Sequence, residues 1–471
     1  MWSGGSGRRR SCEEPMKQFD LVVIGAGPGG YVAAIRGAQL GMRVAVVERG
    51  RPGGVCVNWG CIPSKAILGC AGLYEEMRNA AAYGISCQGL SVDFPEVIRR
   101  SRKIADRMSR GVTYLFRKNG IELIAGDAKI ASPGKVRAGD VEISATHILV
   151  ATGTAVRGLP GIEPDGKTVL TSDDALALET LPRSVAVLGG GAVGVEFAYV
   201  YRAFGAEVTV VEMMDQLLPR VDKEVAEELA KSFRKQGIRV MTSASAKGLD
   251  KATGTLTVSS AGKDEALAAE KVLVAVGRKP LAAGMGLEEC GVQLERGFIK
   301  VDERFRTSCE GIYAVGDVIG GMLLAHEASA EGVAAVEMMA GIATRRPDPD
   351  RMPACIYCRP EVATIGLSEE EARRRGIPVK VSKFPFAALG RAVATGHTEG
   401  FVKMVAEDKH GEVIGCHIIG HGAPDLISEL SLARTVEATF REIGRTVHPH
   451  PTLPEAIREA ALMLGGEAID I

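Results

Sequence analysis

The chain has 471 residues, a length that at ~150 residues per domain indicates about three domains. Hydrophobic residues make up 46% and charged residues 24%, a globular composition that excludes an intrinsically disordered chain. The net charge of −1 gives no overall attraction to nucleic acid or to an anionic membrane, so we expect neither as a partner.

Residues 1–15 carry positive charge but no apolar stretch, so they do not form a secretory signal, and Glu13 and Glu14 argue against a mitochondrial transit peptide. We expect a disordered extension here, with Met16 as a candidate natural start. No window reaches the ~18 apolar residues of a membrane span. Ten cysteines in a chain of this length are not a disulphide framework, which favours a reducing, cytoplasmic location.

Two segments share one strand–glycine–helix–strand pattern. The first copy predicts strands over 19–24 and 43–48 around a helix over 31–40, and the second predicts strands over 184–188 and 207–212 around a helix over 195–204. In G-x-G-x-x-G, glycines permit a tight turn and a close approach of a pyrophosphate to the backbone, and the helix N-terminus attracts its charge. The repeat predicts two dinucleotide sites, formed by Gly25, Gly27, Gly30 and Glu48, and by Gly189, Gly191, Gly194 and Glu212.

The residues after Glu212 indicate which nucleotide the second site prefers. A glutamate at the end of the second strand can accept hydrogen bonds from a ribose diol. Met213, Met214 and Asp215 follow it, with no arginine for a 2′-phosphate, so NAD is expected rather than NADP. A glycine-rich turn without a ligand is the alternative reading of either copy taken alone.

Cys56 and Cys61, separated by four residues, follow the first dinucleotide unit. Pro63 suits the first turn of a helix, which places Cys61 near a helix N-terminus that favours a thiolate. Such a pair can cycle between dithiol and disulphide beside a flavin. The alternatives are buried structural cysteines or half of a zinc site. Zinc prefers shorter spacing and further ligands, and the chain has no second cluster, so we expect no metal.

Further along, residues 148–153, 272–278 and 311–318 read as strands that end in glycine, and the Pro-, Asp- and Arg-rich segment 344–353 marks a boundary. Beyond it, the pattern predicts strands over 361–366, 401–406 and 413–419 and helices over 423–436 and 453–464. This region is an expected α+β domain without a nucleotide fingerprint.

Residues 448–455 offer a base for the dithiol, which needs one because free thiols titrate near ~8.5. His450 is the candidate, with Glu455 holding its ring in one tautomer. The alternative is structural: Thr452 and Glu455 also fit a capping box for the following helix, and His448 or His450 could serve only the fold.

Taken together, these segments resemble the pyridine nucleotide–disulphide oxidoreductases, most closely the branch that oxidises dihydrolipoamide. The resemblance runs from about Lys17 to the C-terminus. It rests on the glycine-rich units, on 56–65, on Ala151-Thr152-Gly153, on Ala314-Val315-Gly316-Asp317 and on His450-Pro451-Thr452-Leu453 with Glu455. It implies two Rossmann-like dinucleotide-binding domains and a C-terminal α+β dimerisation domain. The implied bounds are 16–153 and 280–351 for the FAD domain, 154–279 for the NAD domain and 352–471 for the interface domain.

The resemblance also implies roles for individual residues. Cys56 looks like the thiol that meets the substrate, and Cys61 like the thiol that stacks on the flavin. Lys65 and Glu196 resemble the ion pair beside the flavin's reactive nitrogen, and His450 with Glu455 matches the family's base and its partner. The implied FAD contacts are Gly25, Gly27, Gly30, Glu48, Lys65, Thr152, Gly153, Asp317 and Ala325, and the implied NAD contacts are Gly189, Gly191, Gly194, Glu212 and Gly277.

The activity implied by the resemblance is oxidation of protein-bound dihydrolipoamide to lipoamide with reduction of NAD⁺. The implied assembly is a homodimer in which the histidine comes from the other subunit. The implied partner is a lipoylated acyltransferase, or a lipoyl carrier protein, of a 2-oxo acid dehydrogenase or glycine cleavage complex. A related NAD(P)H-dependent disulphide reductase with another substrate is the alternative. A purely structural subunit would be expected to lose the dithiol or the base, and both are intact.

Three positions bear on these alternatives. Ser64 stands where glutathione-type reductases tend to carry lysine. Trp59 stands where many members have valine, and Cys358 where threonine is expected. Cys358 forms a C-x-x-C with Cys355, which reads either as a second redox pair or metal half-site, or as two reduced cysteines whose side chains face opposite ways on a strand.

Overall fold

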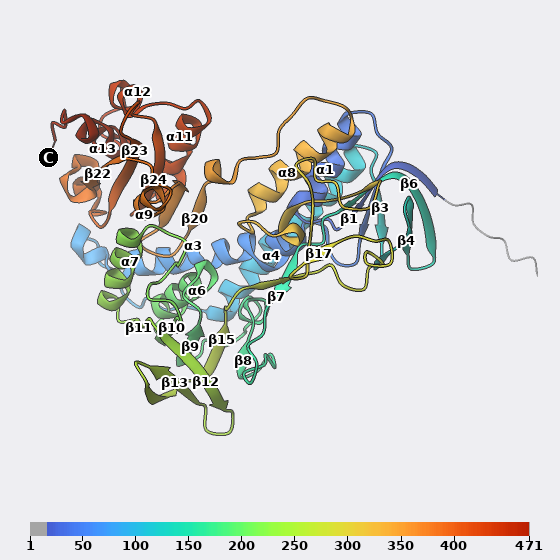
Figure 1. The fold of residues 1–471 in the computed structure, drawn as a ribbon. Coiled ribbons are helices and arrows are strands. Elements are labelled where there is room, and N and C mark those ends of the chain that lie inside the picture. Colours follow the sequence, from blue (N-terminus) through green and yellow to red (C-terminus); the bar gives the residue numbers. More distant parts are fainter. Residues whose placement is uncertain (1–16, 471) are drawn as a thin grey trace, which may run out of the picture.

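The computed structural model describes residues 17–470 (Figure 1). The expected disordered extension over 1–15 and the candidate start at Met16 lie outside the described residues. Within 17–470, no helix combines the length and the apolar character that crossing a membrane requires.

The first dinucleotide unit lies in a seven-stranded sheet of order β3-β2-β1-β6-β5-β4, with β19 also paired to β6. The strands are β1 (Lys17–Ile24), β2 (Val44–Glu48), β3 (Glu122–Ala125), β4 (Ala128–Ser132), β5 (Lys135–Ala138), β6 (Val141–Val150) and β19 (Ile312–Ala314). The β1, β2, β3, β6 and β19 pairings are parallel, whereas β4, β5 and β6 pair antiparallel. Strand β19 brings residues after 311 back to the start of the chain.

Helices α1 (Pro28–Gln39) and α8 (Ala325–Met339), far apart in the sequence, pack against one another (Figure 1). A Cβ on Gly332 would lie 2.5 Å from the carbonyl oxygen of Gly29, so the crossing depends on glycine. The segment before Asp317 lies against both helices, since a Cβ on Gly29 would lie 3.5 Å from Val315 and a Cβ on Gly316 would lie 3.0 Å from Ala328.

The second dinucleotide unit lies in a five-stranded parallel sheet of order β11-β10-β9-β15-β8. Its elements are β8 (Val169–Leu170), β9 (Ser184–Leu188), α6 (Ala192–Ala203), β10 (Glu207–Val211), α7 (Lys223–Lys235), β11 (Arg239–Met241) and β15 (Lys271–Val274). A separate antiparallel sheet of β12 (Ala244–Asp250), β13 (Thr255–Ser260) and β14 (Lys263–Ala268) follows β11 in the chain.

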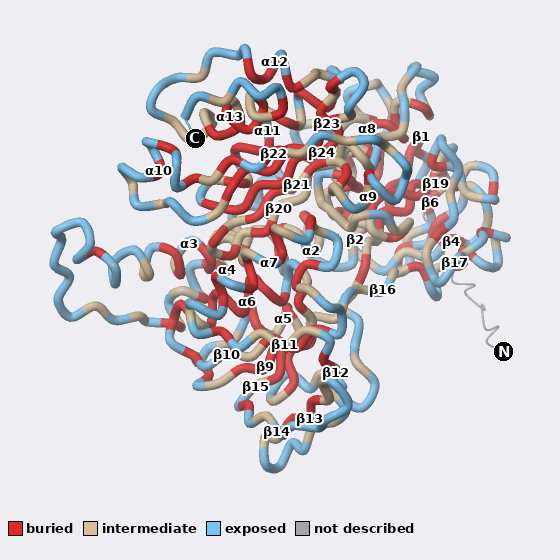
Figure 2. Tube along the Cα trace, turned by 60° about the vertical axis from the view of Figure 1, so that its left-hand side comes forward, coloured by how far each residue is buried: buried red, intermediate tan, exposed pale blue. Residues whose placement is uncertain are grey.

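The C-terminal domain is an antiparallel sheet of order β20-β21-β24-β23-β22 with helices packed on it. Its elements are β20 (Ala354–Ile356), β21 (Val362–Gly366), α9 (Glu369–Arg374), β22 (Val379–Pro385), η4 (Phe386–Ala388), α10 (Gly390–Thr395), β23 (Phe401–Glu407), β24 (Val413–Ile419), α11 (Ala423–Thr435), α12 (Phe440–Arg445) and α13 (Glu455–Gly465). Both β23 and β24 are buried along nearly their whole length, because helices or the second dinucleotide domain cover their faces (Figure 2).

Three helices after β2 lie between these parts: α2 (Gly54–Trp59), α3 (Cys61–Arg78) and α4 (Phe94–Lys118). Helix α3 packs on both α4 and α6, so it joins the first domain to the second. The remaining elements are η1 (Ala80–Tyr83), β7 (Thr154–Val156), α5 (Ser172–Ala175), β16 (Arg278–Pro280), β17 (Leu294–Glu295), β18 (Phe298–Ile299), η2 (Gly316–Ile319) and η3 (Pro349–Arg351).

The expected α/β architecture with a C-terminal α+β domain is confirmed, and the predicted strands of both dinucleotide units are present within a residue or two. The last helix begins at Glu455, two residues after the expected start. Two local readings were wrong. Thr452 forms only half of a capping box, since its Oγ1 donates to the Pro449 carbonyl. Cys358 lies beyond β20, so it does not share a strand with Cys355.

Candidate active site

The two glycine-rich loops have the same geometry, and the first and third glycines of each are required by the fold. A Cβ on Gly25 would lie 2.4 Å from the Ala151 carbonyl oxygen, and a Cβ on Gly189 would lie 2.4 Å from the Ala275 oxygen. The third glycines, Gly30 and Gly194, would each place a Cβ 1.9 Å from the carbonyl oxygen of the first. Glycine is therefore needed at these four positions whether or not a ligand binds.

The middle glycines differ because they face open space. A Cβ on Gly27 would meet nothing closer than 3.9 Å, and a Cβ on Gly191 would meet no described atom within 4 Å. Each caps the N-terminus of the next helix, α1 or α6. An uncrowded backbone at a helix N-terminus fits a pyrophosphate, so both loops fit the dinucleotides expected from the sequence.

Glu48 and Glu212 occupy equivalent places at the ends of β2 and β10. The Glu48 carboxylate accepts from the N–H groups of Ala26 and Gly50, each at 2.7 Å. Glu212 accepts from Gly190 N at 2.5 Å and from Met214 N at 2.7 Å. Both carboxylates are thus held at the mouth of a glycine-rich loop, where a ribose diol would lie.

The redox segment packs directly against the first glycine-rich loop. Gly53 N donates to the Ala26 carbonyl at 2.7 Å, and a Cβ on Gly54 would lie 2.6 Å from the Gly27 Cα. Cys56 lies within the short helix α2, and Cys61 is the first residue of α3, as the position of Pro63 predicted. The two thiols therefore lie beside the loop that fits the first dinucleotide.

Cys56 and Cys61 are free thiols with opposite pKa shifts. The hydrogen bond from Cys56 lowers the pKa of Cys61 to about 7, and the Lys65 ammonium adds to this effect against the opposing influence of burial. The same hydrogen bond, together with burial, raises the pKa of Cys56 far above its ordinary value. In the reduced pair, Cys61 is therefore the thiolate near neutral pH and Cys56 carries the proton.

Lys65 forms an ion pair with Glu196, and both carboxylate oxygens lie 2.9 Å from its Nζ. Glu196 is buried on α6, and it also accepts from the backbone N–H of Tyr357 at 3.0 Å. The Tyr357 ring lies under the Lys65 ammonium, 4.6 Å from Nζ to the ring centroid. Residues from three parts of the chain thus fix one cation beside Cys61.

Asn58 and Trp59 complete helix α2. The Asn58 side-chain NH₂ donates to the carbonyls of Arg51, Pro52 and Gly54. Its buried Oδ1 has no described partner. An orphaned acceptor in the redox segment is consistent with a bound group that donates to it. Trp59 is partly exposed, and the Arg102 guanidinium lies 4.1 Å from its ring centroid, so its bulk is accommodated at the surface of α4.

The other expected cofactor contacts border the same loops. Thr152 Oγ1 donates to the Leu281 carbonyl at 2.7 Å, and Thr154 Oγ1 donates to the Asp317 carboxylate at 2.9 Å. Gly153 and Gly277 have positive φ angles of 69° and 114° and no described crowding of a Cβ. Ala325 is the first residue of α8, so its N–H belongs to an open helix N-terminus.

The two histidines of the 448–455 segment have different surroundings. His448 is 5% exposed, and its ring nitrogens contact Glu429 Oε1 and the Thr446 carbonyl, each at 3.0 Å. His450 is 78% exposed, and its Nδ1 lies 2.9 Å from Glu455 Oε1. His448 is therefore a satisfied structural residue, whereas His450 has an oriented ring with a described partner on Nδ1 only.

Glu455 holds both the ring and the backbone of this segment. Its second oxygen accepts from Thr452 N at 2.7 Å. Although burial opposes it, this N–H and the His450 ring lower the pKa of Glu455, so the carboxylate is ionised and can stabilise an imidazolium. Such an arrangement suits a general base whose free Nε2 faces outward.

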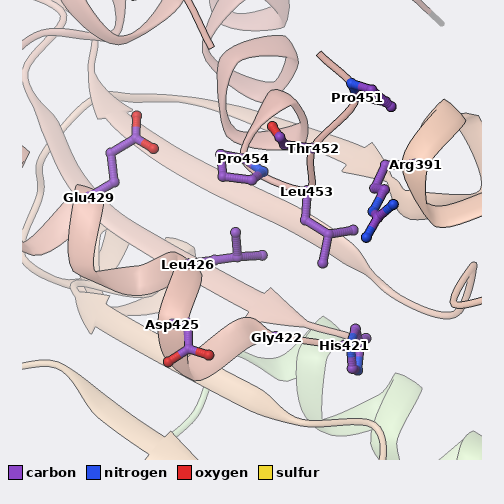
Figure 3. A pocket seen from close by; sticks show the side chains of 10 residues that line it. All are labelled: Arg391, His421, Gly422, Asp425, Leu426, Glu429, Pro451, Thr452, Leu453 and Pro454. Atoms are coloured by element: carbon purple, nitrogen blue, oxygen red, sulfur yellow. The ribbon is translucent and has the colours of Figure 1, made fainter. Parts of the chain in front are cut away.

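No described hydrogen bond or ion pair joins His450 to Cys56 or Cys61 within one chain. The 451–454 segment instead borders a cavity of ≈ 590 Å³ whose other wall is α11 (Figure 3). Figure 3 shows the polar side chains Asp425, Glu429, His421 and Arg391 around this cavity. His450 is thus presented at the surface of the C-terminal domain.

Cys355 and Cys358 lie close to the ion pair of Lys65 but are free thiols. Burial raises the pKa of Cys355 to about 11 and raises that of Cys358 well above its ordinary value. The Cys358 thiol donates to the Pro360 carbonyl at 3.5 Å. Both are therefore protonated and poorly nucleophilic near neutral pH, unlike Cys61.

Comparison with known proteins places these features in a family. The family model described as pyridine nucleotide-disulphide oxidoreductase matches residues 19–332, and that of its dimerisation domain matches 352–461. The chain is a pyridine nucleotide-disulphide oxidoreductase. The expected FAD and NAD dependence of such an oxidoreductase is confirmed, and its dimerisation domain supports a homodimer.

Individual relatives of this oxidoreductase are similar over nearly their whole length. A dihydrolipoyl dehydrogenase of Bacillus subtilis is 43% identical over 469 residues, covering 96% of this chain and 99% of the relative. A dihydrolipoyl dehydrogenase of Chlorobaculum tepidum is 45% identical over 452 residues, covering 94% and 96%. The crystal structure of LpdA from Mycobacterium tuberculosis superimposes with a TM-score of 0.88 at 30% identity, covering 95% of this chain and 100% of that one.

Sequence reasoning missed two contributors to the site of this oxidoreductase. The backbone N–H of Tyr357 donates to Glu196, and a backbone contact of this kind cannot be predicted from the type of residue. Asn58 was not singled out, although a polar residue at the end of the apolar face of α2 was a signal that could have found it.

Proposed function

We propose that this oxidoreductase oxidises dihydrolipoamide to lipoamide and reduces NAD⁺ to NADH. The observation that carries the proposal is the Cys56–Cys61 pair, in which one thiol is stabilised as a thiolate and the other as a thiol beside the first glycine-rich loop. The names of the full-length relatives support dihydrolipoamide as the dithiol.

The proposed organisation follows the expectation from the sequence. Residues 16–153 and 280–351 form the FAD domain, 154–279 the NAD domain and 352–471 the interface domain. FAD is held by Gly25, Gly27, Gly30, Glu48, Lys65, Thr152, Gly153, Asp317 and Ala325, and NAD by Gly189, Gly191, Gly194, Glu212 and Gly277. The open middle glycines and the two glutamates at the loop mouths support these assignments.

When bound, FAD supplies the two-electron relay between the dithiol and NAD⁺. The chain's own residues handle protons and sulphur. His450 of one subunit removes a proton from a substrate thiol at the partner's cysteine pair, and the resulting thiolate attacks Sγ of Cys56. In the oxidised enzyme Cys56 and Cys61 form a disulphide, and this S–S bond breaks with its electron pair on Cys61. The Lys65 cation stabilises the resulting Cys61 thiolate.

The second substrate thiol then attacks the substrate sulphur of the mixed disulphide. Lipoamide leaves, and the proton of that thiol passes to Cys56, whose raised pKa favours the protonated form. Glu455 keeps the His450 ring in one orientation and balances the imidazolium that forms when His450 takes a proton. The cycle requires the His450 of one subunit and the thiols of the other, so a monomer should be inactive.

The proposed physiological partner is a lipoylated acyltransferase, or a lipoyl carrier protein, of a 2-oxo acid dehydrogenase or glycine cleavage complex in the cytoplasm. NAD rather than NADP is supported by Glu212, which can accept from a ribose diol, and by Met213, Met214 and Asp215, which offer no arginine for a 2′-phosphate.

The test is NADH formation from NAD⁺ and free dihydrolipoamide by the purified protein, repeated with NADP⁺. The same preparation is tested for NADPH-dependent reduction of oxidised glutathione. We expect fast turnover of dihydrolipoamide with NAD⁺, and little turnover with NADP⁺ or in the glutathione assay. A yellow protein inactive with dihydrolipoamide would refute the substrate while leaving the fold and FAD in place.

A further inference from the structure

A buried lysine connects the dimerisation domain to the second dinucleotide domain. Lys403, on β23, is only 2% exposed, and lysine is rarely buried unless its charge is paired. Its Nζ lies 3.0 Å from Asp222, 2.8 Å from Glu224 and 2.9 Å from Glu369. The three donors of the ammonium therefore have three carboxylate acceptors, two of them from the start of α7.

Asp222 is the last residue of the loop that follows Glu212. It is buried, it caps α7 by accepting from Glu224 N at 3.1 Å, and it faces Lys403 with both oxygens. Helix α7 also packs against β24 of the dimerisation domain, below that domain in Figure 1. The C-terminal end of loop 213–222 is thus fixed from outside its own domain.

The same loop touches the second glycine-rich turn. Met214 N bonds the Glu212 carboxylate, and Leu218 N donates to the Gly190 carbonyl at 2.8 Å. Leu218 has a φ of 49°, a left-handed conformation that is strained for a residue with a side chain and persists only where the surroundings enforce it. The loop therefore needs anchors at both ends, and these are Glu212 and Asp222.

We propose that Lys403 is a positioning residue for the NAD site: through Asp222, it holds loop 213–222 against the second glycine-rich turn. Removing the ammonium leaves the buried Asp222 carboxylate without its cation, whereas Glu224 and Glu369 keep Lys383 and Arg373, so the start of α7 moves toward solvent and releases the loop. The inference rests on the proposed NAD site and adds that the dimerisation domain sets the affinity of that site.

The main variant is Lys403→Met, which keeps the aliphatic stem and removes the charge. The matched control is Lys383→Met, because Lys383 pairs with the same Glu224 but is half exposed. Asp222→Asn keeps a side chain that caps α7 equally well and removes only the charge facing Lys403. Glu369→Gln removes the charge of one of the three carboxylates around the Lys403 ammonium. It serves as the milder variant if Lys403→Met does not fold.

Three measurements on the FAD-loaded protein test the inference. Calorimetry gives the Kd for NAD⁺, hydrogen exchange reports the N–H groups of Met214 and Leu218, and stopped-flow absorbance follows flavin reduction by the dithiol without nucleotide. We expect Lys403→Met and Asp222→Asn to raise the Kd about tenfold, within the usual range of coupling between sites, and to speed exchange in the loop. Flavin reduction by the dithiol and the Lys383→Met control should match the unmodified protein.

An unchanged Kd in Lys403→Met or Asp222→Asn would overturn the inference, even with faster exchange. A parallel loss of thermal stability and of the dithiol reaction would also overturn it, because the cluster would then support only the fold. Absence of NAD⁺ binding to the unmodified protein would instead refute the proposed nucleotide site.

Discussion

Alanine at Gly191 should weaken NAD⁺ binding while leaving the fold intact. The position has φ −74° and ψ −178°, which alanine adopts without strain, and its Cβ would meet no described atom within 4 Å. Gly→Ala at a compatible position stabilises the folded state by ~0.4–1 kcal/mol, because alanine lowers the conformational entropy of the unfolded chain. Loss of glycine as a preferred helix N-cap costs a similar amount. The free energy of unfolding should therefore change by less than about 1 kcal/mol.

The effect on the nucleotide should be larger, because the added methyl group occupies the space where the pyrophosphate approaches the backbone. Displacing one charged hydrogen bond costs roughly 1.5–3 kcal/mol. At about 1.4 kcal/mol per tenfold, the Kd for NAD⁺ should rise by a factor of roughly 10 to 100. The dithiol half of the reaction does not use this site, so flavin reduction by dihydrolipoamide should be unchanged.

Calorimetric titration with NAD⁺ and thermal unfolding measure the two quantities independently. Gly194→Ala is the contrasting control, since its Cβ would lie 1.9 Å from the Gly189 oxygen and should destabilise the domain itself. Gly27→Ala is the equivalent change in the first loop and should reduce the FAD content of the purified protein instead. An unaltered Kd in a stable Gly191→Ala protein would refute the placement of the pyrophosphate at this glycine.

Three further changes separate the roles of the redox residues. Cys56→Ser should abolish turnover with dihydrolipoamide and leave FAD bound, and a colourless protein would show that the segment is mainly structural. His450→Gln should slow dithiol oxidation while flavin reduction by NADH survives, and near-normal dithiol turnover would rule it out as the base. Lys65→Met removes a cation that lowers the pKa of Cys61, so alkylation of Cys61 should require a higher pH than in the unmodified protein, and an unshifted profile would contradict that role.

The dinucleotide units were predictable because their determinants are local. Strand, glycines, helix and glutamate fall within a single unit, and the pattern marks the four glycines that crowding requires there, Gly25, Gly30, Gly189 and Gly194. The bounds of β9 and β24 were predicted to the residue, since apolar residues dominate both segments. The antiparallel strands β12 to β14 were not predicted, because short, half-exposed strands carry no strong period.

The histidines of the 448–455 segment show where local patterns stop. Spacing made His450 the candidate base, but it left open that either histidine serves only the fold, and the capping-box pattern favoured that structural reading. Burial separates them, because His448 is enclosed with both ring nitrogens engaged while His450 is exposed with Glu455 on one nitrogen. Glu455 also serves the backbone, as the structural reading expected, so one carboxylate satisfies both interpretations.

Residues that act across domains were beyond any local pattern. The ion pair of Lys65 with Glu196 was expected only from the resemblance, and Lys403 carried no signal at all. Both belong to contacts of the second dinucleotide domain, and in both the dimerisation domain supplies a further member: the Tyr357 N–H for Glu196, and the Lys403 ammonium for Asp222. The dimerisation domain therefore braces the nucleotide domain near the thiols and at the NAD loop. Both contacts lie within one chain, so the dimerisation domain can align the second nucleotide domain before any second subunit binds.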